Sequence, residues 1–186
     1  MPILAAEPTI LPGDLITVAN DRLKAGEQWW VMHTLARQEK ELTRRLRAMQ
    51  IAHYCPLVKR RTKSAAGRIR VSHVPLFSSY VFVLGDEAAR YKTLTTKCVA
   101  QCLSVIDSPQ LTFDLSQIKR LIDCDAPLTP EARLQPGSRV RIRSGPMMGL
   151  EGTITKRRGK DWLVVALAFL QQGASVLMED YQVEAI

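Results

Sequence analysis

Apolar residues in the first third of the chain change their spacing in a way that predicts a strand followed by a helix. The dense, bulky run "WWVMH" (29–33) is typical of a β-strand. In "LARQEKELTRRLRAMQI", Leu42, Leu46 and Met49 fall at i, i+4 and i+7, and Leu35 lies one period earlier. This spacing forms one apolar stripe, so it predicts an amphipathic helix that begins directly after the strand.

The next blocks continue the alternation of strands and helices. The run "KRRTKSAAGRIR" predicts a hairpin, because Ser64–Gly67 separates two basic arms as a turn would. "VPLFSSYVFVL" (74–84) predicts a turn and then a core strand. Three more elements are expected: a helix over 86–97, a strand over 99–106 and a helix over 113–124. The order β-α-β-β-α-β-α favours an α+β fold in which helices pack on an antiparallel sheet.

The composition and the apolar periodicity of the chain change beyond residue 124, and we therefore expect a second domain. The segment "DAPLTPEARLQPG" holds three prolines and has no apolar periodicity, which is typical of a linker. Only short β-type runs separated by glycine turns follow it, and these predict a small all-β barrel. The predicted organisation is an N-terminal tail (1–26, with a short helix around 15–23), an α+β domain (27–124), a linker (125–134) and the barrel (135–186).

The barrel is expected to start in "RVRIRSGPMMGLEGTITKRRG", where Arg139, Arg141 and Arg143 alternate with Val140 and Ile142. Alternation of this kind places one face of a strand in a core and the other in water. Glycines after the strand permit a tight reversal. Two interpretations of the arginines stay open at this point, a solvated face and a contact with nucleic acid.

Charge narrows the classes of partner. The 186-residue chain has a net charge of +8 and a pI near 9.6, which favours a polyanionic partner. Residues 35–75 contain eleven Lys and Arg against Glu39 and Glu41, a net charge of +9. No apolar run approaches the roughly 20 residues of a membrane span. The first residues lack the basic region of a signal peptide, so a cytoplasmic protein is expected.

Catalytic and metal-binding patterns are not found in the sequence. Cys55, Cys98, Cys102 and Cys124 show no CxxC spacing, and reduced, mostly buried thiols are expected. "GPMMGLEG" is rich in glycine, but no GK[ST] follows it. The sequence therefore predicts a protein that is not an enzyme and uses no cofactor or metal.

Four blocks in order resemble the NusG family: "WWVMHTLARQEKELTRRL", "YCPLVKRR", "PLFSSYVFV" and a barrel start that resembles the KOW motif. The resemblance covers residues 28–186. It implies an NGN domain that binds RNA polymerase and an SH3-like KOW domain that recruits a second partner, in a monomeric transcription elongation factor. Housekeeping members usually read Phe-Pro-Gly-Tyr where this chain has Phe77-Ser78-Ser79-Tyr80. General factor and specialised paralogue of the RfaH type therefore both stay open.

The resemblance and the charge pattern assign candidate residues to three surfaces. The clamp helices of the polymerase are expected to dock on an apolar hollow formed by Tyr80, Phe82, Val105, Leu76 and Phe77. Contacts with the phosphates of upstream DNA are expected from His33, Arg37, Lys40, Arg44, Lys59, Arg60, Arg61, Arg68 and Arg70. Phe169 and Leu170 are expected to meet the KOW partner, which in the family is Rho or a small-subunit ribosomal protein.

A different class of function also fits the barrel. A ribosome-associated assembly or structural protein could grip RNA with a KOW barrel, and an RNA-modifying enzyme is a more distant reading. An assembly protein has no need of an aromatic hollow on its N-terminal sheet. The presence of that hollow favours the transcription factor.

Overall fold

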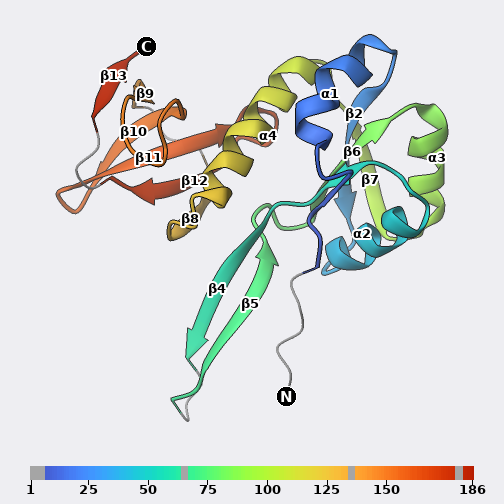
Figure 1. The fold of residues 1–186 in the computed structure, drawn as a ribbon. Coiled ribbons are helices and arrows are strands. Elements are labelled where there is room, and N and C mark those ends of the chain that lie inside the picture. Colours follow the sequence, from blue (N-terminus) through green and yellow to red (C-terminus); the bar gives the residue numbers. More distant parts are fainter. Residues whose placement is uncertain (1–6, 64–66, 134–136, 179–181) are drawn as a thin grey trace. The chain divides into compact units, whose positions relative to one another are not determined.

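The computed structural model describes residues 7–63, 67–133, 137–178 and 182–186, apart from the side chain of Arg70. Contacts divide the chain into two compact units, Met1–Ile106 and Asp107–Ile186, which are called here the N-terminal and the C-terminal unit. Figure 1 shows their helices and strands.

The N-terminal unit is built on a five-stranded antiparallel sheet, as the sequence predicted. Three helices belong to the same unit: α1 (Leu15–Lys24), α2 (Glu39–Ala48) and α3 (Glu87–Thr95). The strands in spatial order are β1 (Ile10–Leu11), β3 (His53–Tyr54), β6 (Tyr80–Gly85), β2 (Gln28–Thr34) and β7 (Val99–Ser104).

Strand alternation explains how this sheet builds a core with α2. Successive side chains of a strand point to opposite faces. Trp30 and Met32 of β2, together with Val81 and Val83 of β6, form one buried cluster with Leu42 and Leu46 of α2. The face on which α2 packs is therefore made of alternate residues from the two central strands.

Helix α2 begins later than the sequence predicted. Its first residue is Glu39, and Leu35 lies in the preceding turn, where it is 48% exposed. Arg37 has φ of 61°, a left-handed conformation that cannot continue a right-handed helix. Met49 follows the helix and is half-exposed, so the buried stripe is reduced to its central positions, Leu42 and Leu46.

The basic hairpin is a separate two-stranded sheet. Strands β4 (Leu57–Lys63) and β5 (Ile69–Pro75) pair in antiparallel register over their full lengths. The expected tip lies outside the described residues over 64–66. Figure 1 shows the two strands running away from the five-stranded sheet as a ribbon. This pair of strands is called the ribbon below.

The residues before the sheet are packed rather than loose. The helix expected around residues 15–23 is α1, and its Leu15 and Ala19 are fully buried. Strand β1 pairs with β3 at the edge of the sheet, and the amide of Cys55 donates to the carbonyl of Thr9 at 2.7 Å. Polar and turn-forming residues interrupt the apolar residues of this segment, so its sequence shows no clear periodicity. The structure nevertheless places these apolar residues in an edge strand and in a short helix.

The C-terminal unit contains a six-stranded antiparallel sheet, which confirms the expected all-β character of this region. Its helix is α4 (Ser108–Asp123), and a 3-10 turn, η1 (Ala168–Leu170), follows β11. The strands in spatial order are β13 (Val183–Ala185), β9 (Ser138–Ile142), β10 (Glu151–Arg157), β11 (Lys160–Leu167), β12 (Gln172–Leu177) and β8 (Leu128–Glu131).

The expected linker at 125–134 contains strand β8, which pairs with β12. Pro130 is compatible with this strand because β8 lies at the sheet edge, where a missing N–H does not interrupt a ladder. Helix α4 is bonded to the same unit. The guanidinium of Arg120 donates to the carbonyl oxygens of Met148 and Gly149, at 2.5 and 3.3 Å. The contacts therefore separate the units before α4, at Ile106, although the linker was expected after it.

Both Gly149 and Gly152 were expected to permit the reversal after β9; Gly149 lies in that turn, whereas Gly152 lies in β10 and has a different role. Gly149 has φ of 80°, which a residue with a side chain rarely adopts. A Cβ atom on Gly152 would lie 2.5 Å from the carbonyl oxygen of Val164 on β11. The reversal between β9 and β10 and the close pairing of β10 with β11 both depend on these residues.

Candidate nucleic-acid interface

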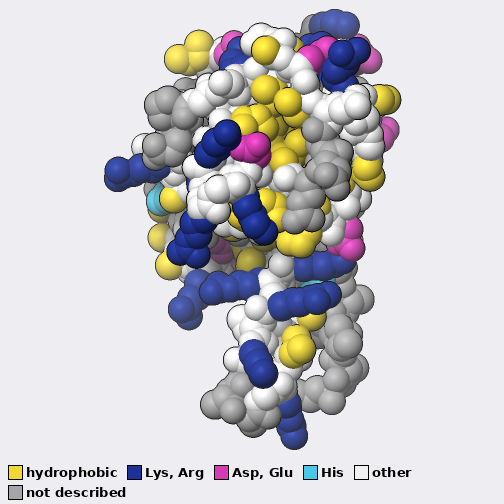
Figure 2. Space-filling view, turned by 90° about the vertical axis from the view of Figure 1, so that its left-hand side faces the viewer, with side chains coloured by type: hydrophobic (Ala, Val, Ile, Leu, Met, Phe, Trp, Pro, Cys, Tyr) yellow, Lys and Arg dark blue, Asp and Glu magenta, His cyan; other side chains and the backbone are white. Residues whose placement is uncertain are grey.

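The ribbon presents its cations to solvent. Arg60, Arg61 and Lys63 are exposed, and no ion pair among the described residues joins any of the three to a carboxylate. Residues 42–85 contain no Asp or Glu at all, so sequence neighbours offer no partner. Lys59 and Arg68 are exposed as well, and the side chain of Arg70 lies outside the description. Figure 2 shows Lys and Arg side chains along the ribbon, with hydrophobic side chains between them.

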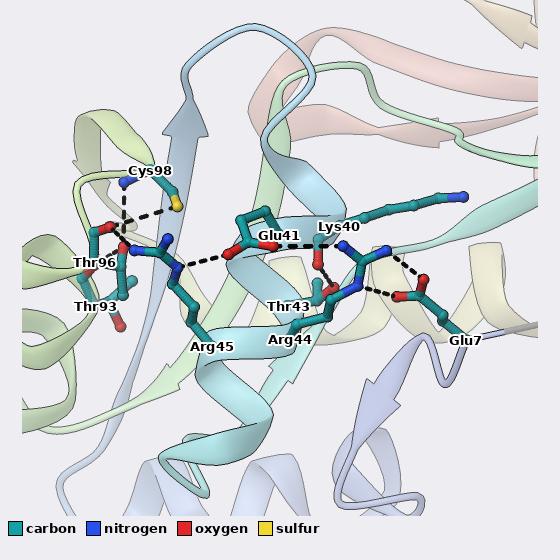
Figure 3. Close-up of polar contacts among 9 residues, drawn as sticks. All are labelled: Glu7, Lys40, Glu41, Thr43, Arg44, Arg45, Thr93, Thr96 and Cys98. Carbon is teal, nitrogen blue, oxygen red and sulfur yellow. Dashed lines mark hydrogen bonds and ion pairs between the residues drawn. The ribbon is translucent and has the colours of Figure 1, made fainter.

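The cations of α2 are engaged in a different way (Figure 3). The guanidinium of Arg44 donates two hydrogen bonds to Glu7, at 2.6 and 3.1 Å, and a weaker one to Glu41. The hydrogen bond from Arg44 holds the pKa of the Glu7 carboxyl below its ordinary value. Arg45 donates to Glu41 and to the carbonyl oxygen of Thr96. The predicted phosphate contact at Arg44 is therefore already occupied by a carboxylate.

The other predicted contacts of this region, Lys40, Arg37 and His33, differ in their surroundings. The ammonium group of Lys40 extends away from the carboxylates in Figure 3. Arg37 is exposed in the left-handed turn before α2. His33 lies on β2 directly opposite Tyr80 of β6, with the two ring centroids 5.1 Å apart. The structure thus places one candidate for DNA contact beside one candidate for polymerase contact.

Most residues of the predicted apolar hollow are buried. Phe82 is fully buried and packs edge-on against Phe77, with the ring centroids 6.1 Å apart. Leu76 and Val105 are also buried, at 4% and 6% exposure. Tyr80 alone of the five keeps an intermediate exposure. A partner helix can therefore reach Tyr80 directly, while the other four residues lie in the core.

The turn before β6 shows how the chain accommodates serine where the family usually has glycine. Ser79 has φ of 66°, in the left-handed region that disfavours side chains. Its amide donates to Glu39 Oε1 at 2.7 Å, and its carbonyl oxygen accepts from the Thr34 amide at 2.8 Å. Glu39 is buried, so its carboxylate has a structural role here. The altered turn therefore keeps Tyr80 at the start of the strand.

Phe169 and Leu170 both lie in η1 of the C-terminal unit. Phe169 is 36% exposed, and Leu170 is half-buried. The amide of Ala168, which starts this turn, donates to Asp114 Oδ2 of α4 at 2.8 Å. Burial raises the pKa of Asp114, against the lowering effect of this hydrogen bond and of the one from Gln110. A partner at Phe169 would therefore meet a turn that α4 already holds.

Two of the three arginines of the barrel start, Arg141 and Arg143, are paired with carboxylates. Arg141 donates to Glu151 at 2.6 Å and lies 3.6 Å from Glu184. Arg143 also lies 3.6 Å from Glu184. Glu151 and Glu184 belong to the neighbouring strands β10 and β13, opposite Arg141 in the register. These cross-strand pairs favour the solvated face over the nucleic-acid contact for this stretch.

The sequence did not indicate that two carboxylates, Glu7 and Glu39, hydrogen-bond to residues far away in the chain. Glu7 and Arg44 are 37 residues apart, and Glu39 and Ser79 are 40 residues apart. Neither separation follows a helical or strand period, so neither pair gives a sequence signal. Sequence reasoning also missed Ile69 and Val71 of β5, which are 70% and 50% exposed beside the ribbon cations. The alternation of Ile69 and Val71 with Arg68 and Arg70 in the sequence could have indicated a strand with aliphatic residues beside cations.

The cysteines and the acidic residues give no sign of a metal site within the described parts of the chain. Among the described residues, no cluster of three or more His, Cys, Asp or Glu has the arrangement of a metal site. All four cysteines are free, and burial raises the pKa of Cys55 to about 12. Within the described parts of the chain, no helix has the length and apolar character needed to cross a membrane.

Comparison with known proteins adds one positive result. The family model described as "Transcription termination factor nusG" matches residues 27–121, just over half of the chain. The matched segment contains the ribbon, Tyr80 and the sheet from β2 onward, and it ends inside α4. No curated protein matches the chain.

Proposed function

We propose, from the premise that this chain belongs to the NusG family, that its N-terminal unit binds RNA polymerase and thereby modulates pausing or termination. Members of this family are transcription elongation and termination factors, which bind RNA polymerase and are not enzymes. The observation that carries the proposal is the match itself, because it covers the sheet and the ribbon that hold the candidate contacts.

Tyr80 is the proposed centre of the polymerase contact. Its ring is partly exposed at the start of β6 and is supported laterally by His33. Tyrosine is enriched among the few interface residues that dominate binding, since it combines apolar area with a hydroxyl that tolerates water. Phe77 and Phe82 are buried beneath this position and hold the strand rather than forming the first contact.

The ribbon is proposed to contact nucleic acid near the polymerase. Its exposed cations lie in a segment without acidic residues, so an approaching phosphate backbone meets no competing carboxylate from that segment. Contacts with phosphates position a protein without reading sequence. The C-terminal unit is proposed to be a KOW domain that recruits Rho or a small-subunit ribosomal protein, with Phe169 and Leu170 at the contact.

The test is binding of the full chain to purified core RNA polymerase from its host. Tyr80→Ala is expected to cost about 2 kcal/mol of binding, roughly thirtyfold in affinity. Tyr91→Ala is the matched control, because Tyr91 of α3 is 68% exposed and carries none of the proposed contacts. Circular dichroism of both variants checks that the fold is kept.

Two outcomes contradict the proposal. Equal binding of wild type and folded Tyr80→Ala excludes Tyr80 as an anchor. Capture of ribosomal subunits without polymerase, when the tagged chain is isolated from its host, supports the ribosome-associated alternative instead. A transcription assay then shows whether wild type changes pausing or termination, as a NusG-family factor is expected to do.

A further inference from the structure

The two faces of the ribbon differ in chemistry. Residues that lie directly opposite each other on paired strands share a face. On one face the opposite pairs combine a cation of β4 with His73, Val71 or Ile69 of β5. These pairs are Lys59 with His73, Arg61 with Val71, and Lys63 with Ile69. A row of three cations therefore runs beside a row that contains two aliphatic side chains, and this is called the mixed face below.

The aliphatic residues of the mixed face do not belong to the core of the unit. Ile69 is 70% exposed and Val71 is 50% exposed, although both are β-branched and lie on a regular strand. On the opposite face, Val58 is buried where the ribbon joins the sheet. The two pairs farther out on that face are Arg60 with Ser72 and Thr62 with Arg70, and neither pair includes an aliphatic residue. Exposed aliphatic side chains therefore accompany cations on the mixed face, in the outer part of the ribbon.

The dimensions of the ribbon suit one groove of duplex DNA. The major groove of B-DNA is about 12 Å wide and admits a two-stranded ribbon without distortion, whereas the minor groove is only about 6 Å wide. The major groove of A-form RNA is too narrow to be read by side chains. Alternate residues on β4 are about 6.6 Å apart, so the cation row can follow a phosphate backbone along the groove.

Apolar side chains in the major groove have one specific partner. Thymine carries a C5-methyl group there, and apolar side chains contact it. We infer that the ribbon lies in the major groove of duplex DNA, with Ile69 and Val71 against thymine methyl groups and Lys59, Arg61 and Lys63 at the adjacent phosphates. This inference rests on the proposed contact of the ribbon with nucleic acid and adds the groove, the face and the base feature that is read.

The test compares two duplexes that differ only in the methyl groups. Binding of the full chain is measured by fluorescence anisotropy on an A·T-rich duplex and on the same duplex with uracil in place of thymine. Wild type is expected to bind the thymine duplex about fourfold more tightly for each methyl group that it buries. Equal affinity for the two duplexes overturns the inference.

Substitution of the aliphatic pair assigns the effect to the ribbon. Ile69→Thr with Val71→Thr keeps β-branched residues, and therefore strand propensity, while it removes apolar surface. Each threonine keeps only one γ-methyl group, so this double variant is expected to lose part of the preference for thymine. It is expected to keep the salt dependence of wild type, because no cation is lost. Val183→Ser on β13, another half-exposed valine, is the control and is expected to retain the preference for thymine.

Crosslinking separates DNA from a protein partner. A photoreactive residue at position 69 is expected to crosslink to DNA in a reconstituted elongation complex. Crosslinks to polymerase alone, or a double variant that keeps the full thymine preference, overturn the inference. Neither result alters the Tyr80 experiment, since that variant leaves the ribbon unchanged. Failure of the groove placement is therefore distinguishable from failure of the proposed function.

Discussion

The ribbon and the start of the barrel both place cations on alternate positions of a strand, yet they differ in what lies opposite. In the barrel, Arg141 of β9 lies between Glu151 of β10 and Glu184 of β13. In the ribbon, Arg61 lies opposite Val71, and no acidic residue occurs between positions 42 and 85. The same alternation therefore forms an internally neutralised surface in one region and an exposed positive surface in the other.

The difference teaches that cross-strand partners decide what a basic strand can bind. An arginine that is already hydrogen-bonded to a carboxylate must break that contact before it binds a phosphate. Arg44 of α2 is an intermediate case, because it is exposed on a helix but bonded to Glu7 from the segment before β1. The number of Lys and Arg residues in a segment is therefore a weaker guide to phosphate binding than the number that have no carboxylate partner.

The largest effect is expected from removing the ribbon cations. Replacement of Lys59, Arg60, Arg61 and Lys63 by glutamine removes four candidate phosphate contacts. Each lost contact lowers the slope of log K against log salt by about 0.9. Between 50 and 200 mM salt, wild type should therefore lose about a hundredfold more DNA affinity than the variant does. Anisotropy titrations at several salt concentrations measure this difference.

The matched control removes four cations from the barrel instead. Glutamine at Arg139, Arg141, Arg143 and Lys156 changes the net charge by the same amount. The salt slope is expected to stay close to that of wild type, because two of these arginines are paired with glutamates. Equal losses in both variants would mean that overall charge, and not the ribbon, governs DNA binding.

The second-largest effect is expected from removing the charge of Glu131, which is hydrogen-bonded to Arg157 of the C-terminal sheet. Glu131 of β8 accepts two hydrogen bonds from Arg157 and one from Ser175. Glu131→Gln is expected to destabilise the pairing of β8 with β12 by about 1–2 kcal/mol at pH 7, since hydrogen bonds to charged groups are stronger than neutral ones. Hydrogen exchange of the β8 and β12 amides measures this loss directly.

The pH dependence of that effect has a definite sign. Burial raises the pKa of Glu131, but the hydrogen bonds from Arg157 and Ser175 outweigh it, and the net pKa lies below the ordinary 4.5. A lowered pKa in the folded state stabilises the fold above the unfolded value and is lost as pH falls through the folded one. The difference between wild type and Glu131→Gln should therefore shrink below about pH 4. A difference that persists in acid would exclude the ionised carboxylate as its cause.

The smallest effect is expected at Arg44. Glu7→Gln removes the stronger of the two carboxylate partners of Arg44 and leaves only the 3.4 Å contact with Glu41, so Arg44 should become more available to a phosphate. DNA affinity should rise by about two- to threefold, since one further phosphate contact is gained under screened conditions. A decrease in affinity after Glu7→Gln would contradict this role.

Local patterns predicted the elements well, because the alternation and the helical stripe each arise from a single buried face. Strand β2 and the central residues of α2 follow directly from their apolar spacing. The start of α2 could not be predicted, since nothing in the sequence shows that Arg37 adopts a left-handed conformation. Strand β8 was hidden for a related reason: it pairs with β12, more than 40 residues later, and its own four residues include Pro130, which is unusual in a strand.

The sequence predicted which residues are candidates for the sites, but it did not predict which of their side chains are exposed. Tyr80 and Phe82 alternate identically in sequence, and only the packing of Phe77 against Phe82 shows that one ring is exposed and the other is core. The sequence made the cations of the ribbon and of α2 equally good candidates for phosphate contact. The structure distinguishes them, because Arg44 of α2 is hydrogen-bonded to Glu7. Pairing between distant residues is the information that a single sequence lacks.

Strand β1 has a practical consequence for work on fragments of this protein. It pairs with the outer side of β3, so it closes one edge of the N-terminal sheet. A fragment limited to the family segment, 27–121, would lack β1 and leave the backbone groups of β3 unpaired. Unpaired sheet edges are templates for pairing with other chains. Self-association of such a fragment would then reflect the cut and not the oligomeric behaviour of the intact protein.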